Sequence, residues 1–141
     1  AADAAAHIWG ATLVNDISVR DLQRRHGQFF IGKAQDNGCP MGPALVSKDE
    51  FDLADLRLRT WVNDELRQDG HTRQLIFSPG AVIEQISAGV TLYPGDVIAL
   101  GTPAGVGAGF DPPRFLKPGD EVRIRVDEIG ELANPVAAYP G

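Results

Sequence analysis

The stretch LVNDISVRDLQRRHGQFFIGK, residues 13–33, decides how the rest of the chain is arranged, because apolar, acidic and basic elements follow one another closely within it. An apolar run from Trp9 to Val14 is typical of a buried strand, and it ends at the polar pair Asn15-Asp16. A Gly-Lys pair closes the stretch at Lys33. A carboxylate just after the C-terminal end of a strand and an ammonium group on the next segment suit the binding of a metal ion and an anionic substrate.

Between these two charged residues the spacing predicts a short helix. Ser18 and Asp21 have the S-x-x-D separation of a capping box, so a helix is expected to begin at Ser18 and to end at Gly27. The same position would let Asp16 cap that helix rather than bind a ligand. Lys33 could equally be one more solvated surface lysine. Asp36, close to it in the sequence, is the expected ion-pair partner of its ammonium group. Spacing alone leaves these alternatives open.

The remainder of the chain is rich in strand patterns and in Gly/Pro turns. Further strands are expected over residues 44–47, 56–62, 65–69, 97–100, 121–126 and 131–136. One amphipathic helix is expected over residues 79–88, opened by Ser78 and stopped by Gly89. Pro-Gly-Asp turns recur within residues 93–96 and 117–120. The predicted fold class is therefore mainly β with short helices.

Composition limits the classes of protein that this chain can represent. Its 141 residues, 43% of them hydrophobic, suffice for one core, so residues 1–141 are expected to form a single domain. The formal net charge of −6 argues against a nucleic-acid partner. No apolar run approaches the roughly 18 residues that span a bilayer. The single cysteine, Cys39, precludes an internal disulfide and is expected to be a buried small hydrophobe. The histidines lack the spacing of metal ligands and are expected to be surface or structural residues: His7, His26 and His71. These features predict a cytoplasmic protein with no membrane partner.

A glycine-rich loop follows the strand expected over residues 97–100. Residues 101–109, GTPAGVGAG, might suggest a dinucleotide fingerprint, yet Pro103 and the prolines at 112 and 113 prevent the helix that would hold a pyrophosphate. What remains is a loop whose backbone can approach a ligand closely, with the Thr102 hydroxyl as a hydrogen-bond donor. The alternative is a long turn between two strands, and spacing alone does not separate the two.

Taken together, several separated motifs resemble the fumarylacetoacetate hydrolase family, including its 2-hydroxyhepta-2,4-diene-1,7-dioate isomerase-like members. The match runs in order from about Trp9 to about Val136 and is highly specific for the family, although it is weak for the substrate. It rests on NDISVRDLQ at 15–23, Gly32-Lys33 with Asp36, LRTWVNDELRQ at 58–68, LYPGDV at 92–97, GTPAGVG at 101–107 and FLKPGD at 115–120.

This resemblance implies a mixed β-sandwich or rolled β-barrel of the C-terminal catalytic type, usually assembled as a homodimer. It also implies a divalent metal, Mg²⁺ or Mn²⁺ with Ca²⁺ as a further option, held by three carboxylates, of which Asp16 matches the third. The other two form a Glu-x-Glu pair N-terminal to the matched region, and a His-Glu dyad lies earlier still. Neither pair is present here, and residues 1–7 read like the tail of a helix without an initiator Met. The resemblance therefore implies an incomplete catalytic domain that lacks its N-terminal part.

The remaining site residues are also carried over from the resemblance. Lys33 matches a catalytic lysine at the metal and substrate site, while Gln23 and Thr102 match substrate-contacting residues. The implied function is metal-dependent hydrolysis of a C–C bond in a small acylpyruvate-like oxo-acid through a metal-stabilised enolate. Isomerisation or decarboxylation of a hydroxymuconate-type dioate is one alternative. The other is a non-catalytic binding domain that has lost the Glu-x-Glu ligands.

Overall fold

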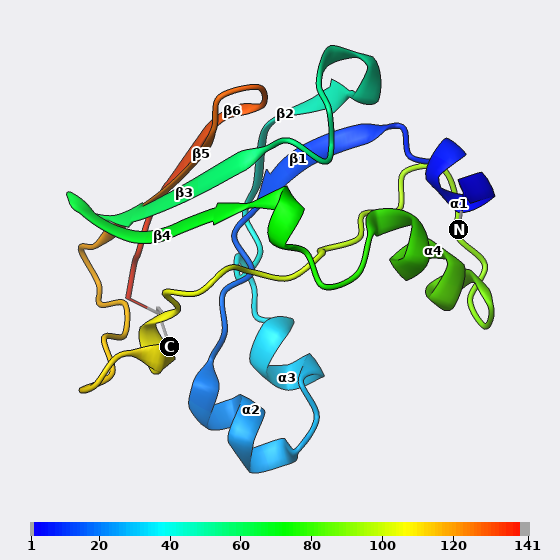
Figure 1. Cartoon of the computed structure of the whole chain (residues 1–141). Coiled ribbons are helices and arrows are strands. Elements are labelled where there is room, and N and C mark those ends of the chain that lie inside the picture. The colour runs from blue at the N-terminus through cyan, green and yellow to red at the C-terminus, as the bar shows by residue number, and fades with distance from the viewer. Residues whose placement is uncertain (1, 139–141) are drawn as a thin grey trace.

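The computed structural model describes residues 2–138, whose strands form two antiparallel sheets (Figure 1). The four-stranded sheet has the order β4-β3-β5-β6, with β3 at Arg57–Val62, β4 at Glu65–His71, β5 at Glu121–Val126 and β6 at Gly130–Pro135. The two-stranded sheet pairs β1, Gly10–Val14, with β2, Met41–Ser47. The α-helices are α1 at Ala2–Ala6, α2 at Arg20–His26, α3 at Phe30–Lys33 and α4 at Pro79–Ser87. Single 3-10 turns occupy η1 at Lys48–Glu50, η2 at Thr72–Gln74 and η3 at Gly107–Gly109. Short helices beside antiparallel sheets are what the sequence predicts.

The core lies between the two sheets. Val122, Ile124 and Val126 alternate along β5 and are 5%, 5% and 2% exposed, so every second residue of this central strand points inward. Leu13 on β1 is buried in the same hydrophobic cluster, together with Leu132 on β6. Because strands of both sheets bury their apolar faces against one another, residues 2–138 form a small sandwich.

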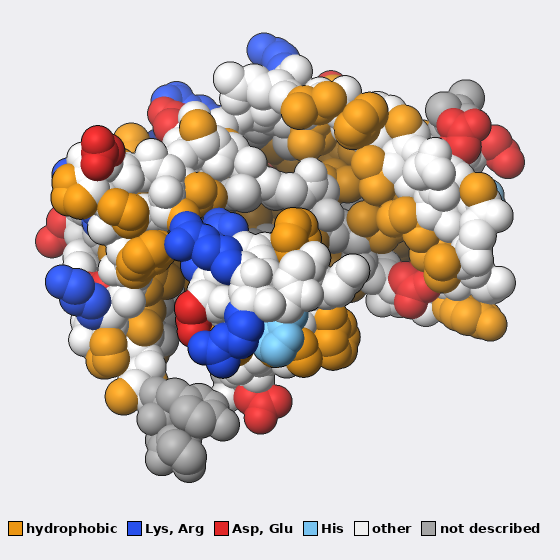
Figure 2. All heavy atoms as spheres, turned by 90° about the horizontal axis from the view of Figure 1, so that it is seen from below, with side chains coloured by type: hydrophobic (Ala, Val, Ile, Leu, Met, Phe, Trp, Pro, Cys, Tyr) orange, Lys and Arg blue, Asp and Glu red, His pale blue; other side chains and the backbone are white. Residues whose placement is uncertain are grey.

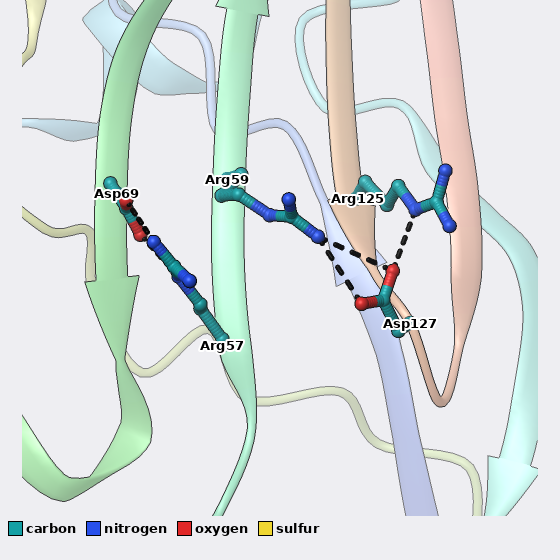
Figure 3. A network of polar contacts seen from close by, with 5 residues as sticks. All are labelled: Arg57, Arg59, Asp69, Arg125 and Asp127. Carbon is teal, nitrogen blue, oxygen red and sulfur yellow. Dashed lines mark hydrogen bonds and ion pairs between the residues drawn. The ribbon is translucent and has the colours of Figure 1, made fainter.

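The hairpin β3–β4 presents the opposite, charged face of the larger sheet (Figure 3). Arg57 on β3 donates two hydrogen bonds to Asp69 on β4, at 2.8 and 2.6 Å. Arg125 and Arg59 both reach Asp127, at 2.7 and 3.2 Å. The hydrogen bond from Arg57 lowers the pKa of the Asp69 carboxyl, and that from Arg125 lowers the pKa of Asp127. Both carboxylates are therefore held in the charged form.

An indole lies within this charged face. The guanidinium groups of Arg59 and Arg123 lie 5.7 and 5.0 Å from the centre of the Trp61 ring. Trp61 on β3 is paired with Arg123 on β5, which explains why the two side chains meet. Cation–π contacts of this kind keep a half-buried aromatic ring on an otherwise polar surface.

Several helix ends and turns lie where the sequence predicts them, because they depend on residues only a few positions apart. Ser78 caps α4 by accepting a hydrogen bond from the Ala81 amide at 3.2 Å. Gly27 ends α2 with a φ of 61°. The turn glycines Gly95 and Gly119 have φ values of 99° and 94°, as the Pro-Gly-Asp pattern predicts.

The prediction of a strand over residues 97–100 is wrong. This segment forms neither helix nor strand, and Val97 and Leu100 are 56% and 37% exposed. A strand requires a neighbour to satisfy its backbone groups, and within residues 2–138 none pairs with this segment. Figure 1 shows the chain running from α4 across the molecule towards β4 without regular structure.

Several element boundaries also differ from expectation, by one to three residues. β2 begins at Met41 rather than at residue 44, although it contains Pro43. Proline is tolerated there because β2 belongs to a two-stranded sheet and so has a free edge. The helix expected from Ser18 begins at Arg20, and its N-cap residue, Val19, provides no side-chain hydrogen bond. Among the described residues, no helix combines the length and the apolar character needed to cross a membrane.

Candidate functional site

Asp16 and Lys33 form an ion pair at the end of β1. The Lys33 ammonium lies 2.6 Å from Asp16 Oδ2, and the two side chains are 30% and 47% exposed. The Asp16 carboxylate does not cap α2, and the Lys33 ammonium does not point into free solvent. The structure thus brings together the two residues whose roles spacing alone left open.

Backbone hydrogen bonds around α2 and α3 explain this meeting. The Val19 amide donates to the Gly32 carbonyl at 2.9 Å, which ties the start of α2 to the end of α3. A Cβ atom at Gly32 would lie 2.9 Å from Gln23 Cβ, so only glycine allows the two helices to approach this closely. The Ile17 amide donates to the Gly38 carbonyl at 3.0 Å, which fixes the segment that carries Asp16. The close packing of α2 against α3 therefore places the Lys33 ammonium beside the Asp16 carboxylate.

Gln23 supports this helix pair. Its side-chain oxygen accepts a hydrogen bond from Arg20 at 2.9 Å, within the same helix. One open depression extends over more than half of residues 2–138, with Asp16, Lys33 and Thr102 among its lining residues, whereas Gln23 does not line it. Figure 2 shows hydrophobic side chains gathered around a hollow on the face seen from below. A substrate contact by Gln23 stays a prediction.

Thr102 lies on the glycine-rich loop and is held by the edge strand β4. Gln68 Nε2 donates to Thr102 Oγ1 at 2.8 Å and to the Pro103 carbonyl oxygen at 3.0 Å. Sequence reasoning missed Gln68, although it lies within the LRTWVNDELRQ motif. The pairing of the two strands could have identified it, because Gln68 lies opposite the buried Thr60 and so points to the same face of the sheet. That pairing depends on the bulge after Thr60, which the sequence pattern does not reveal.

The described residues do not complete a metal centre. Within residues 2–138, no group of three or more His, Cys, Asp or Glu side chains is arranged to hold a metal ion. Asp16 supplies one carboxylate, and its partner is a lysine. Dedicated Mg²⁺ and Ca²⁺ sites draw on several oxygen ligands. Residues 2–138 thus supply one of the several carboxylate ligands that a divalent metal site requires.

Three further expectations are settled by the geometry. The ion-pair partner of Lys33 is Asp16 and not Asp36, because the pairing of α2 with α3 turns the ammonium towards β1. Cys39 is exposed rather than buried, because it lies on the loop between α3 and β2. His71 has a structural role, as expected, since its Nδ1 accepts from the Arg73 amide at 3.2 Å.

Comparison with known proteins identifies relatives over nearly the whole chain. The family model for the fumarylacetoacetate hydrolase C-terminal domain matches residues 1–137. The oxaloacetate tautomerase YisK of Bacillus subtilis is 53% identical over 135 residues, which cover 95% of this chain and 45% of that protein.

Solved structures share the fold. A fumarylacetoacetate hydrolase from Exiguobacterium antarcticum is 46% identical with a TM-score of 0.94, over 98% of this chain and 50% of its own. A maleylpyruvate hydrolase from Sphingobium sp. SYK-6, determined in complex with manganese(II) and pyruvate, is 39% identical with a TM-score of 0.82. That match covers 96% of this chain and 47% of the hydrolase. The chain therefore spans about half the length of the relatives that it matches.

Proposed function

The chain belongs to the fumarylacetoacetate hydrolase family, and from this premise we propose that the full-length protein stabilises the enolate of a small 2-oxo acid. Tautomerisation of a 2-oxo dicarboxylic acid such as oxaloacetate is the leading reaction, because the relative that is 53% identical bears that activity in its name. The observation that carries the proposal is the Asp16–Lys33 ion pair at the end of β1. Thr102 lines the same open depression, which extends over more than half of residues 2–138.

Each residue has a role that its chemistry suits. A divalent metal such as Mn²⁺ or Mg²⁺, when bound, would polarise the 2-oxo group as a Lewis acid, with Asp16 as one of its ligands. The Lys33 ammonium provides a positive charge where negative charge develops on the substrate oxygen. The Thr102 hydroxyl donates a hydrogen bond to an oxygen of the same substrate. Proton transfer between carbon and oxygen then yields the other tautomer.

Hydrolysis of a C–C bond in an acylpyruvate-like substrate is the second candidate. The likeness to a maleylpyruvate hydrolase favours it, and such cleavage passes through an enolate as well. Isomerisation or decarboxylation of a hydroxymuconate-type dioate shares that intermediate. All these reactions need a complete metal site, so the proposal includes carboxylates from outside residues 1–141 and assembly as a homodimer in the cytoplasm. A non-catalytic binding domain is the outcome that remains if no substrate is converted.

The proposal is tested with Asp16→Asn in the full-length protein. Tautomerisation of oxaloacetate is followed by the ultraviolet absorbance of its enol. Cleavage of acylpyruvates is followed by the loss of their ultraviolet absorbance, and Mn²⁺ binding is measured by titration calorimetry. We expect Mn²⁺ affinity and turnover to fall together, by about tenfold or more, because a ligand is lost. Asp64→Asn makes the same chemical change in an exposed hairpin turn and should change neither. Full metal affinity in Asp16→Asn would exclude the ligand role, and an inactive wild type would favour the binding domain.

A further inference from the structure

Gln68 lies behind Thr102 and connects it to the four-stranded sheet. Its side-chain nitrogen makes two hydrogen bonds to the glycine-rich loop, one to Thr102 Oγ1 at 2.8 Å and one to the Pro103 carbonyl oxygen at 3.0 Å. Gln68 itself is half-buried on β4, whereas Thr102 is exposed. A partly buried amide therefore holds an exposed hydroxyl.

These contacts fix which group donates. The Pro103 carbonyl oxygen can only accept, so the NH₂ end of the Gln68 amide must face the loop. One of its two hydrogens is used there, and the other is directed at Thr102 Oγ1. The threonine oxygen is thus an acceptor in this bond, and its own hydrogen must point elsewhere. In the part of the chain that the structure describes, the Thr102 hydroxyl donates to no other group.

Close packing keeps the loop in this position. A Cβ atom at Gly70 on β4 would lie 2.5 Å from Pro103 Cβ, and one at Gly105 would lie 1.8 Å from the Arg67 carbonyl oxygen. Glycine at both positions lets the loop lie directly against the edge of β4. The geometry of Gln68 and Thr102 is therefore set by the sheet and not by a freely moving loop.

We propose that Gln68 is a positioning residue that directs the O–H of Thr102 towards the substrate oxygen. This inference rests on the proposed function, in which Thr102 contacts the substrate. Gln68 occupies one of the two acceptor lone pairs of the hydroxyl, so the O–H hydrogen is directed away from Gln68 and is free to meet a ligand oxygen. A hydroxyl oriented in advance loses less rotational freedom when the substrate binds or when charge develops on it.

Gln68→Glu in the full-length protein tests the proposal, because it changes the amide to a carboxylate of nearly the same shape. A carboxylate only accepts, so it would take the Thr102 hydrogen for itself and withdraw it from the substrate. We expect kcat/KM to fall by about tenfold to a hundredfold, as in Thr102→Val, since both changes remove the same hydrogen bond. In a Thr102→Val background, Gln68→Glu should cause a much smaller loss, which comes only from the broken hydrogen bond to the Pro103 carbonyl.

The double variant separates orientation from simple charge repulsion. A negative charge that merely repelled an anionic substrate would lower kcat/KM in the Thr102→Val background as much as in the wild type, and this result would overturn the proposal. Gln85→Glu on the exposed side of α4 adds the same charge and should leave kinetics unchanged. Wild-type kinetics in Gln68→Glu would also reject the positioning role while leaving the proposed function intact.

An inactive wild type would instead reject the proposed function and, with it, the substrate contact of Thr102. The hydrogen bond between Gln68 and Thr102 can then still be tested by NMR of the Gln68 side-chain amide. The signals of this amide are assigned because they disappear in Gln68→Glu. We expect Thr102→Val to shift one of its two proton signals and to speed exchange of that proton with solvent. An unchanged signal would show that the amide does not hold the threonine.

Discussion

Replacement of Lys33 by methionine should separate function from stability. The substitution keeps an unbranched apolar chain, one atom shorter than that of lysine, and removes the charge. At the 2.6 Å separation from Asp16, the Coulomb attraction in a water-like medium is about 1 to 2 kcal/mol. Because 30% of Lys33 and 47% of Asp16 are exposed, screening and the ordering of two side chains reduce this to about 0.2–1 kcal/mol. The free energy of unfolding should therefore fall by less than about 1 kcal/mol.

Turnover should respond much more strongly than stability. Loss of a charge that stabilises a developing oxyanion typically lowers kcat by about 10²-fold or more. We would measure kcat and KM for the favoured 2-oxo acid, Mn²⁺ affinity by calorimetry, and unfolding by urea. Lys117→Met, in an exposed turn, is the matched control and should preserve all three quantities. Destabilisation of Lys33→Met by several kcal/mol, or turnover at the wild-type rate, would refute the reasoning.

Three other changes probe the fold that carries this pair. Ile124→Ala, which empties part of the core at a residue 5% exposed, should lower the free energy of unfolding by about 2–5 kcal/mol in urea titrations. Gly105 has a φ of 106°, and a Cβ atom there would clash with the Arg67 carbonyl oxygen, so Gly105→Ala should displace the loop that carries Thr102. We expect kcat/KM to fall as a result, and an unaltered crystal structure of the loop would contradict this. Hydrogen bonds from the Asn63 side chain and the Lys117 amide lower the pKa of Asp120, so its contribution to stability is complete above the ordinary carboxyl pKa and is lost as the pH falls below about 4. Asp120→Asn should therefore flatten the acid side of a plot of melting temperature against pH.

Elements whose local chemistry is decisive could be predicted from the sequence. The alternation of Val122, Ile124 and Val126 is the pattern behind the strand expected over residues 121–126, and the Pro-Gly-Asp turn within residues 117–120 places its beginning. Ser78 identified the start of α4 in the same way. These features depend on residues a few positions apart, so the pattern contains all that is needed.

Features that depend on distant partners were not predictable in the same way. Residues 97–100 have the composition of a strand, but a strand exists only where another chain segment meets its backbone groups. The partner of Lys33 depends on how α2 packs on α3, so the nearer Asp36 was the wrong candidate and Asp16 the right one. The resemblance supplied Asp16, Lys33 and Thr102 as site residues, whereas Gln68 became visible only through its hydrogen bonds.

The placement of Trp61 between two guanidinium groups has a practical consequence for spectroscopy. The protein has two tryptophans, and the other, Trp9, is 64% exposed. A Trp9→Phe variant would leave Trp61 as the single tryptophan, whose emission reports on the pairing of β3 with β5. Melting of the larger sheet could then be followed by tryptophan fluorescence without an added dye.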